Sequence, residues 1–216
     1  PGRFRQAVVD AMAPAAFHRA FPDGPAAAVR CRRLGGDGSD RQWYRLSSGR
    51  HQLILADHGI TPEAPGSEVN AFVKIGTHLR SCGLPVPQIV ASDHFSGLVF
   101  LEDLGCLHLQ DEVRRAADAR QVERLYPSAI DTWLALTVAA AGGFDPTWTC
   151  QSRAYDIPLI LDKECRYFVE AFLNGYLGLT AAYEDLAPEF ETLARRTVDH
   201  GAQGLIHRDF QSRNIM

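Results

Sequence analysis

The sequence predicts an α+β fold in which a mixed N-terminal lobe, residues 1–104, precedes a mainly helical C-terminal lobe, residues 105–216. In the first half, short apolar segments alternate with glycine-rich turns, a pattern typical of antiparallel strands. In the second half, apolar residues recur at helical spacing. With 216 residues, of which 46% are hydrophobic, the chain is long enough to bury sizeable cores. We therefore expect a five-stranded antiparallel sheet with a helix, followed by several helices.

The first lobe begins with a helical pattern over residues 3–21, interrupted by Pro14, which predicts one helix or two short ones. A further helix is expected over residues 66–82, because Val69, Phe72 and Val73 recur at helical spacing. Gly83 then supplies a stop. The five strands are expected at residues 28–34, 42–46, 52–56, 88–91 and 97–101.

The second lobe is expected to hold helices over residues 127–141, 157–177 and 186–200, each with helical apolar spacing. The pair Asp145-Pro146 marks a loop between the first two. This lobe therefore lacks any strand pattern until its final residues.

Composition narrows the class of partner. The formal net charge is -4, and no run of lysine and arginine offers a footprint for nucleic acid. No apolar run approaches the roughly 20 residues that cross a bilayer, and the first ten residues lack the apolar centre of a signal peptide. The five cysteines form no CxxC pair, which argues against a disulfide framework or a zinc site. We expect a cytoplasmic protein that binds neither nucleic acid nor membrane.

The most specific motif is His207-Arg208-Asp209, followed by Asn214 five residues after the aspartate. This is the HRDxxxxN pattern of a kinase catalytic loop. At this spacing Asp209 can accept the proton of an attacking hydroxyl, while Asn214 can offer an oxygen to a magnesium ion on the phosphates. The alternative is that both residues merely satisfy backbone groups of a turn.

A glycine-rich turn lies between the first two expected strands and consists of Gly35, Gly36, Asp37, Gly38 and Ser39. Small residues there would let backbone amides approach phosphate oxygens. The turn is neither a Walker loop nor a full GxGxxG motif, and a plain hairpin would use similar residues.

A third candidate is the connector after the last strand, with Glu102, Asp103 and Leu104. In a kinase-like arrangement, its backbone would hydrogen-bond the edge of adenine, because a flat base in an apolar slot needs only a few polar contacts. An ordinary strand end is the alternative.

Taken together, these motifs resemble the aminoglycoside phosphotransferase superfamily, which has a protein-kinase-like fold of two lobes. Within it the chain is most similar to anomeric N-acetylmuramate/N-acetylglucosamine kinases. The resemblance is carried by the glycine turn, the loop from His207 to Met216 and the stretches Gly83-Leu84-Pro85-Val86-Pro87 and Leu101-Glu102-Asp103-Leu104-Gly105. These cover nearly the whole chain in matching order.

The resemblance implies ATP-dependent phosphorylation of a small-molecule hydroxyl, with ATP in the junction between the lobes, Asp209 as base and Asn214 as ligand of Mg²⁺. The acceptor it favours is the anomeric hydroxyl of an amino sugar. An aminoglycoside or a choline-like amine stays open, as does a catalytically inactive binding module. Asp162 and Glu164 are candidates for contacts to the acceptor, or are simply solvated charges.

Two features depart from the kinase pattern. The strand over residues 52–58 has no lysine to hold the phosphates, so that Glu68 on the following helix has only Arg41, Arg45 or His58 as a basic partner. A second metal-binding aspartate is also missing, and we expect it to follow Met216 in a longer protein. We predict that a polypeptide ending at Met216 is inactive or nearly so, because phosphoryl transfer depends on positioning and charge neutralisation.

Overall fold

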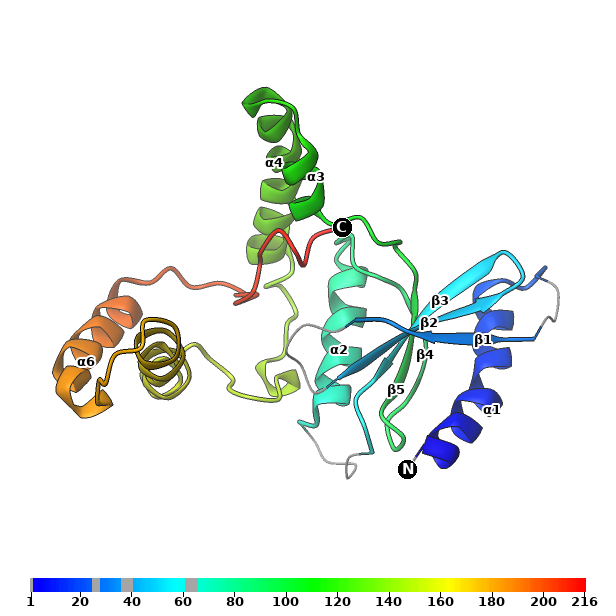
Figure 1. The fold of residues 1–216 in the computed structure, drawn as a ribbon, viewed down its shortest axis with the longest axis horizontal. Coiled ribbons are helices and arrows are strands. Elements are labelled where there is room, and N and C mark those ends of the chain that lie inside the picture. The colour runs from blue at the N-terminus through cyan, green and yellow to red at the C-terminus, as the bar shows by residue number, and fades with distance from the viewer. Residues whose placement is uncertain (1, 25–27, 36–40, 61–65) are drawn as a thin grey trace. The chain divides into compact units, whose positions relative to one another are not determined.

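A computed structural model describes residues 2–24, 28–35, 41–60 and 66–216 of the chain (Figure 1). By their internal contacts these residues divide into two compact units. The first consists of Pro1–Cys150 together with His207–Met216, and the second is Gln151–Ile206. This division follows local packing rather than lobes, so the predicted lobe boundary between residues 104 and 105 stays a prediction.

A five-stranded antiparallel sheet forms the centre of the first unit, with strand order β1-β2-β3-β5-β4. The strands are β1 (Arg30–Arg33), β2 (Gln42–Ser48), β3 (His51–Asp57), β4 (Ile89–Asp93) and β5 (Leu98–Glu102). Each falls where the apolar segments and turns predicted it. With the helices described below, the sheet confirms the predicted α+β fold.

Helix α1 (Gly2–Ala20) covers one face of the sheet (Figure 1). Its buried residues Val9, Ala13, Ala16 and Phe17 lie along one side of the helix and pack against strand residues that include Phe100. The helix is continuous although Pro14 lies inside it. Pro14 is exposed, and packing of the opposite side against the sheet offsets the loss of one backbone hydrogen bond.

Helix α2 (Glu68–Ser81) covers the other face and begins at the N-cap Ser67, whose hydroxyl accepts the backbone N–H of Asn70. Val69 of the helix is buried with Ala56, Val99 and Leu101 of the strands. Side chains alternate between the two faces along a strand. Even-numbered residues at the end of β3 therefore face α2 and odd-numbered ones face α1.

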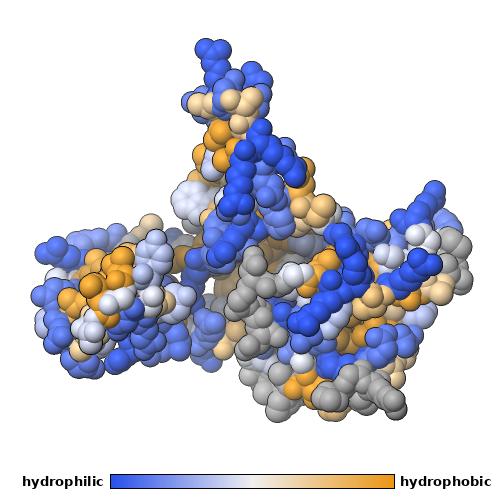
Figure 2. Space-filling view, in the orientation of Figure 1, coloured by the Kyte–Doolittle hydropathy of each residue, from blue (hydrophilic) through white to orange (hydrophobic). Residues whose placement is uncertain are grey.

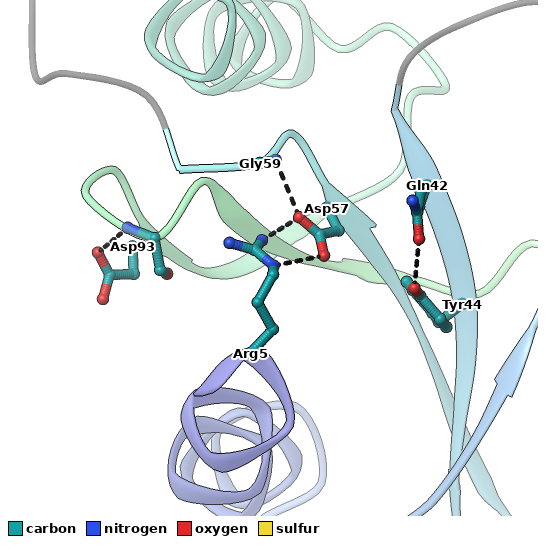
Figure 3. A network of polar contacts seen from close by, with 7 residues as sticks. Arg5, Gln42, Tyr44, Asp57, Gly59 and Asp93 are labelled. Atoms are coloured by element: carbon teal, nitrogen blue, oxygen red, sulfur yellow. Dashed lines mark hydrogen bonds and ion pairs between the residues drawn. The ribbon is translucent and has the colours of Figure 1, made fainter. Parts of the chain in front are cut away.

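The end of β3 is fixed by a polar network (Figure 3). Arg5 of α1 donates to both carboxylate oxygens of Asp57, and the Asp57 carboxylate also accepts the backbone N–H of Gly59 at 2.9 Å. The next residue, His58, donates its backbone N–H to the carbonyl of Gly97 at 2.8 Å. These contacts hold His58 at a defined position against α2.

Gly97 and Gly59 approach so closely that no side chain fits between them. Gly97 has φ +67°, and a Cβ there would lie well inside the van der Waals contact distance of the Gly59 carbonyl oxygen. We expect Gly97→Ala to destabilise the protein by more than the ~1 kcal/mol that a left-handed backbone costs an alanine. Urea unfolding measures the difference.

Gly83 provides the matched control for that substitution. It also has a positive φ, of 82°, but a Cβ there would meet nothing within 4 Å. Gly83→Ala should therefore show the conformational cost alone. Equal losses for the two variants would contradict the close approach of the two glycines.

Four helical segments complete the first unit. They are α3 (Leu109–Arg115), α4 (Ala119–Leu134), the π-helix η1 (Ala135–Ala139) and the short 3₁₀ turn η2 (Pro146–Trp148). The predicted start of a helix at Pro127 was wrong. Helix α4 starts at Ala119, because the side chain of Asp118 accepts the backbone N–H of Gln121 and caps it, and Pro127 lies inside the helix.

Apolar side chains are exposed along α4 and η1, and Figure 2 shows apolar surface on α4. Ile130, Trp133, Leu134 and Val138 are each 46–73% exposed. Buried apolar area is what stabilises a core. The stability of the first unit therefore depends chiefly on the sheet and the two helices that cover it.

The second unit is helical. It consists of α5 (Ile157–Leu159), the π-helices η3 (Ile160–Cys165) and η4 (Phe168–Tyr176), and α6 (Tyr183–His200). Its core contains Ile160, Cys165 and Ala194. Among the helices of the described residues, none is long and apolar enough to cross a membrane.

Candidate active site

The loop that follows the second unit brings the two predicted catalytic-loop residues together. The carboxylate of Asp209 accepts a hydrogen bond from Asn214 Nδ2 at 2.7 Å and another from the side-chain amide of Gln211. Asn214 Nδ2 also donates to the backbone carbonyl of Asp209 at 3.0 Å. Asp209 and Asn214 are both exposed, so solutes can reach them.

The chemistry of this pair fixes the orientation of the Asn214 amide. An ionised carboxylate only accepts hydrogen bonds, so the group of Asn214 that contacts it must be the NH₂ donor. The carbonyl oxygen Oδ1 of Asn214 therefore points away from Asp209 and keeps its lone pairs. An amide oxygen in this state is a suitable ligand for a hard cation such as Mg²⁺.

The backbone before Asp209 has an unusual conformation. Arg208 has φ 66°, in the left-handed region that residues other than glycine rarely adopt. Such a conformation persists where the surroundings hold it, and it occurs often at functional sites. Arg208 directly precedes Asp209, the residue that accepts the hydrogen bond from Gln211.

Helix α3 anchors this loop. The backbone N–H groups of Leu109 and Gln110, at the start of the helix, donate to the carbonyls of Ile215 at 2.8 Å and Ser212 at 3.0 Å. The first N–H groups of a helix have no hydrogen-bond acceptor within the helix. The catalytic loop supplies two of these acceptors.

The sequence interpretation missed α3, although its composition carried a signal. Acidic residues occupy its first turn and basic residues its last turn, as the helix dipole favours. At seven residues it is too short for a clear apolar period. Its role in holding the catalytic loop could not be read from the local sequence.

The connector after β5 is held by acidic side chains. Asp103, 6% exposed, forms an ion pair with Arg45 of β2, with 2.6 Å between Nε and Oδ2. Arg45 also donates to the carbonyl of Gly105 at 2.6 Å. Glu102 accepts the backbone N–H of Gln88 at 3.0 Å, and Leu104 is 43% exposed. The two carboxylates thus fix the shape of the connector, and a contact from its backbone to adenine stays a prediction.

Of the predicted glycine turn, only Gly35 belongs to the described residues, and it is exposed. Gly36, Asp37, Gly38 and Ser39 lie outside them. Their predicted contact with phosphate therefore stays a prediction.

The structure identifies the basic partners of Glu68, at the start of α2. Arg41, just before β2, donates to Glu68 Oε1, and His58 Nδ1 lies 3.6 Å from the same oxygen. Arg45 lies elsewhere, at the connector. Burial, followed by the charge of Arg41, lowers the pKa of His58 from 6.5 to about 4, so its ring is neutral near pH 7.

Asp162 and Glu164 belong to the second unit, on the π-helix η3, and both are exposed. Asp162 pairs with Lys163 at 2.9 Å, and the hydrogen bond and charge of Lys163 lower the pKa of Asp162. Their predicted contact with an acceptor stays a prediction.

Comparison with known proteins agrees with these features. The chain matches the model of the phosphotransferase enzyme family over residues 30–216. It is 28% identical over 182 residues to the N-acetylmuramate/N-acetylglucosamine kinase of Pseudomonas aeruginosa, a match that covers 83% of this chain and 49% of that protein. It is 33% identical over 135 residues to the protein of the same name from Caulobacter vibrioides, covering 51% of this chain and 36% of that protein.

The chain thus spans about half, or less, of the length of these relatives. The family match includes all five strands, α2, the second unit and the whole catalytic loop, and it leaves out α1. It confirms the resemblance to the aminoglycoside phosphotransferase superfamily that the motifs predicted. The chain belongs to the phosphotransferase enzyme family.

Proposed function

We propose that the protein is an ATP-dependent kinase that phosphorylates a hydroxyl of an amino sugar, with N-acetylmuramate and N-acetylglucosamine as the first acceptors to test. The observation that carries this proposal is the pairing of Asp209 with Asn214. Their side chains are 2.7 Å apart in an exposed loop, and the orientation of the amide leaves its oxygen for a cation.

In this proposal Asp209 accepts the proton of the acceptor hydroxyl as that oxygen attacks the γ-phosphate. Gln211 and Asn214 hold the carboxylate by donating to it, which fixes the direction of its lone pairs. An anomeric hydroxyl is more acidic than an ordinary alcohol, so a weaker base is sufficient to remove its proton.

The residues present fit a magnesium ion that is bound mainly by nucleotide and water. Among the described residues no group of three or more histidine, cysteine, aspartate or glutamate side chains could hold a metal. Mg²⁺ usually takes only one or two protein ligands and completes its shell with phosphates and water. Asn214 Oδ1 would be one such ligand. When bound, the ion neutralises charge on the transferring phosphates.

The amino-sugar acceptor rests on the two relatives, whose names state N-acetylmuramate and N-acetylglucosamine. The test is nucleotide consumption by the full-length gene product with Mg²⁺, offered N-acetylmuramate, N-acetylglucosamine, choline and an aminoglycoside in separate reactions. We expect turnover with at least one of the two amino sugars, at a rate above that with the other acceptors.

Turnover with choline or the aminoglycoside alone would support the proposed kinase activity and contradict the proposed amino-sugar acceptor. Nucleotide binding without turnover on any of the four would favour an inactive binding module. ATP and GTP should be compared in the same assay. The base is expected to contact the backbone of the connector, whose acidic side chains are engaged in contacts within the protein.

A further inference from the structure

Two arginines, Arg45 within β2 and Arg41 just before it, lie on the face of the sheet that α2 covers. Arg45 pairs in register with Ile54, and Trp43 with Ala56, both on this face. Arg41 is the residue immediately before β2, and it lies on the same side of the sheet as Trp43. The two arginines are four residues apart, or about 13 Å along the strand. Arg45, in the middle of β2, contacts the connector, and Arg41 directly follows the glycine turn in sequence.

Among the described residues, the cations that contact Glu68 are Arg41 and His58. The lysines of the chain are Lys74 and Lys163. Lys74 is exposed on α2, and Lys163 belongs to the second unit. The arginines of β1 are exposed, and Arg45 is committed to Asp103 and the Gly105 carbonyl. Arg41 is the arginine that contacts the α2 glutamate.

The guanidinium of Arg41 is held on two sides. Glu68 accepts its hydrogen bond, and the aromatic rings of Trp43 and Phe72 lie 5.5 and 5.1 Å from its central carbon. Stacking on aromatic rings and pairing with a carboxylate together restrict an arginine to one geometry. Glu68 is nevertheless 50% exposed and Arg41 21% exposed, so a solute can reach the pair.

The side chain of His58, next to Glu68, is 1% exposed. Its ring packs edge-on against Phe72 at 5.2 Å. Its Nδ1 lies 3.6 Å from Glu68 Oε1, just beyond hydrogen-bond distance, and Nε2 has no hydrogen-bond partner among the residues that the structure describes. Because the ring is neutral, it competes only weakly for the Glu68 carboxylate, which therefore pairs with Arg41.

We propose that Arg41 binds the phosphate groups of the nucleotide, and that Glu68 positions its guanidinium for this contact. The proposal rests on the proposed kinase function. In protein kinases a lysine on the third strand, paired with a helix glutamate, binds the phosphates. Here the helix glutamate is present, and the cation comes instead from the residue that precedes β2.

Arginine suits this arrangement chemically. A guanidinium carries five N–H donors in a planar fork, so it can contact a carboxylate along one edge and phosphate oxygens along another. A nucleotide that lies along β2 with its base at the connector would bring its phosphates towards Arg41.

The test compares the affinities of the full-length protein for ADP and for adenosine by calorimetry. We expect Arg41→Gln to weaken ADP binding about 10- to 100-fold, the loss typical of a hydrogen bond to a charged group. Adenosine binding should be unchanged, because adenosine has no phosphate. Arg50→Gln removes the same charge from the exposed β2–β3 turn and should leave both affinities as in the unchanged protein.

Two further variants separate charge from geometry. Arg41→Lys keeps the charge but lacks the planar fork, so it should recover part of the loss. Glu68→Gln keeps Arg41 but removes the carboxylate that holds it, so ADP should bind more weakly than to the unchanged protein and more tightly than to Arg41→Gln.

The outcomes separate this inference from the proposed function. If Arg41→Gln binds ADP as tightly as the unchanged protein, the inference is wrong and the kinase function stands. Equal losses for ADP and adenosine would also overturn it, because they would give Arg41 a structural role only. If the unchanged protein binds neither ADP nor ATP in the presence of Mg²⁺, the proposed function itself fails.

Discussion

Asp209→Asn is expected to lower the turnover number of the full-length protein by about 10²- to 10⁴-fold, the usual contribution of a positioned general base. The substituted amide cannot take the proton of the acceptor hydroxyl. The affinity for ADP without Mg²⁺ should change little, because Asp209 contacts Gln211 and the proposed metal ligand Asn214 rather than the arginine proposed to bind phosphate. Steady-state kinetics with the preferred amino sugar, together with calorimetric titration of ADP, measure the two effects separately.

Asp131→Asn is the matched control for this prediction. Asp131 is exposed on α4, and its substitution removes the same charge. It should leave turnover unchanged. An Asp209→Asn protein that retains turnover within tenfold of the unchanged protein would remove the role of general base from Asp209 and with it the main support for the proposed mechanism.

Phe100→Ala is expected to destabilise the protein by about 3–5 kcal/mol, as truncations of fully buried aromatic side chains do. Phe100 lies on β5, is 0% exposed, and packs in the core between the sheet and α1. Removing its ring leaves a cavity that strands on both sides restrict from closing. Urea unfolding followed by tryptophan fluorescence is a suitable measurement, since Trp43 packs on the other face of the same sheet.

Phe95→Ala is the control for that loss. Phe95 lies in the turn between β4 and β5 and is 62% exposed. Its truncation should change the free energy of unfolding by no more than about 0.5 kcal/mol. Similar losses for the two variants would contradict the location of the core.

Strong local patterns predicted the sheet lobe well. The predicted strand over residues 52–56 is observed as β3 (His51–Asp57), and the predicted helix over residues 66–82 as α2 (Glu68–Ser81). Both have an apolar period that matches their geometry, with turn residues or a glycine at their ends. The register of the strands and the order β1-β2-β3-β5-β4 needed the structure, because pairing joins residues far apart in sequence.

The helical half was predicted less well because its signals compete. The apolar spacing predicted a helix that begins at Pro127. The capping side chain of Asp118 starts α4 earlier, and the helix tolerates the proline. Helix α3 was missed because it is short and its first N–H groups are satisfied by the loop at Ile215, not by neighbours in sequence.

By itself, the sequence determined the α+β class and the family, and it singled out Asp209 and Asn214, because these depend on residue order and short spacing. Only the tertiary structure decided which cation meets Glu68. Arg41, Arg45 and His58 were equal candidates in the sequence. The strand register and the close approach of Gly97 to Gly59 place Arg41 and His58 at the start of α2 and leave Arg45 at the connector. Such contacts arise from the packing of a sheet against a helix, which no local pattern encodes.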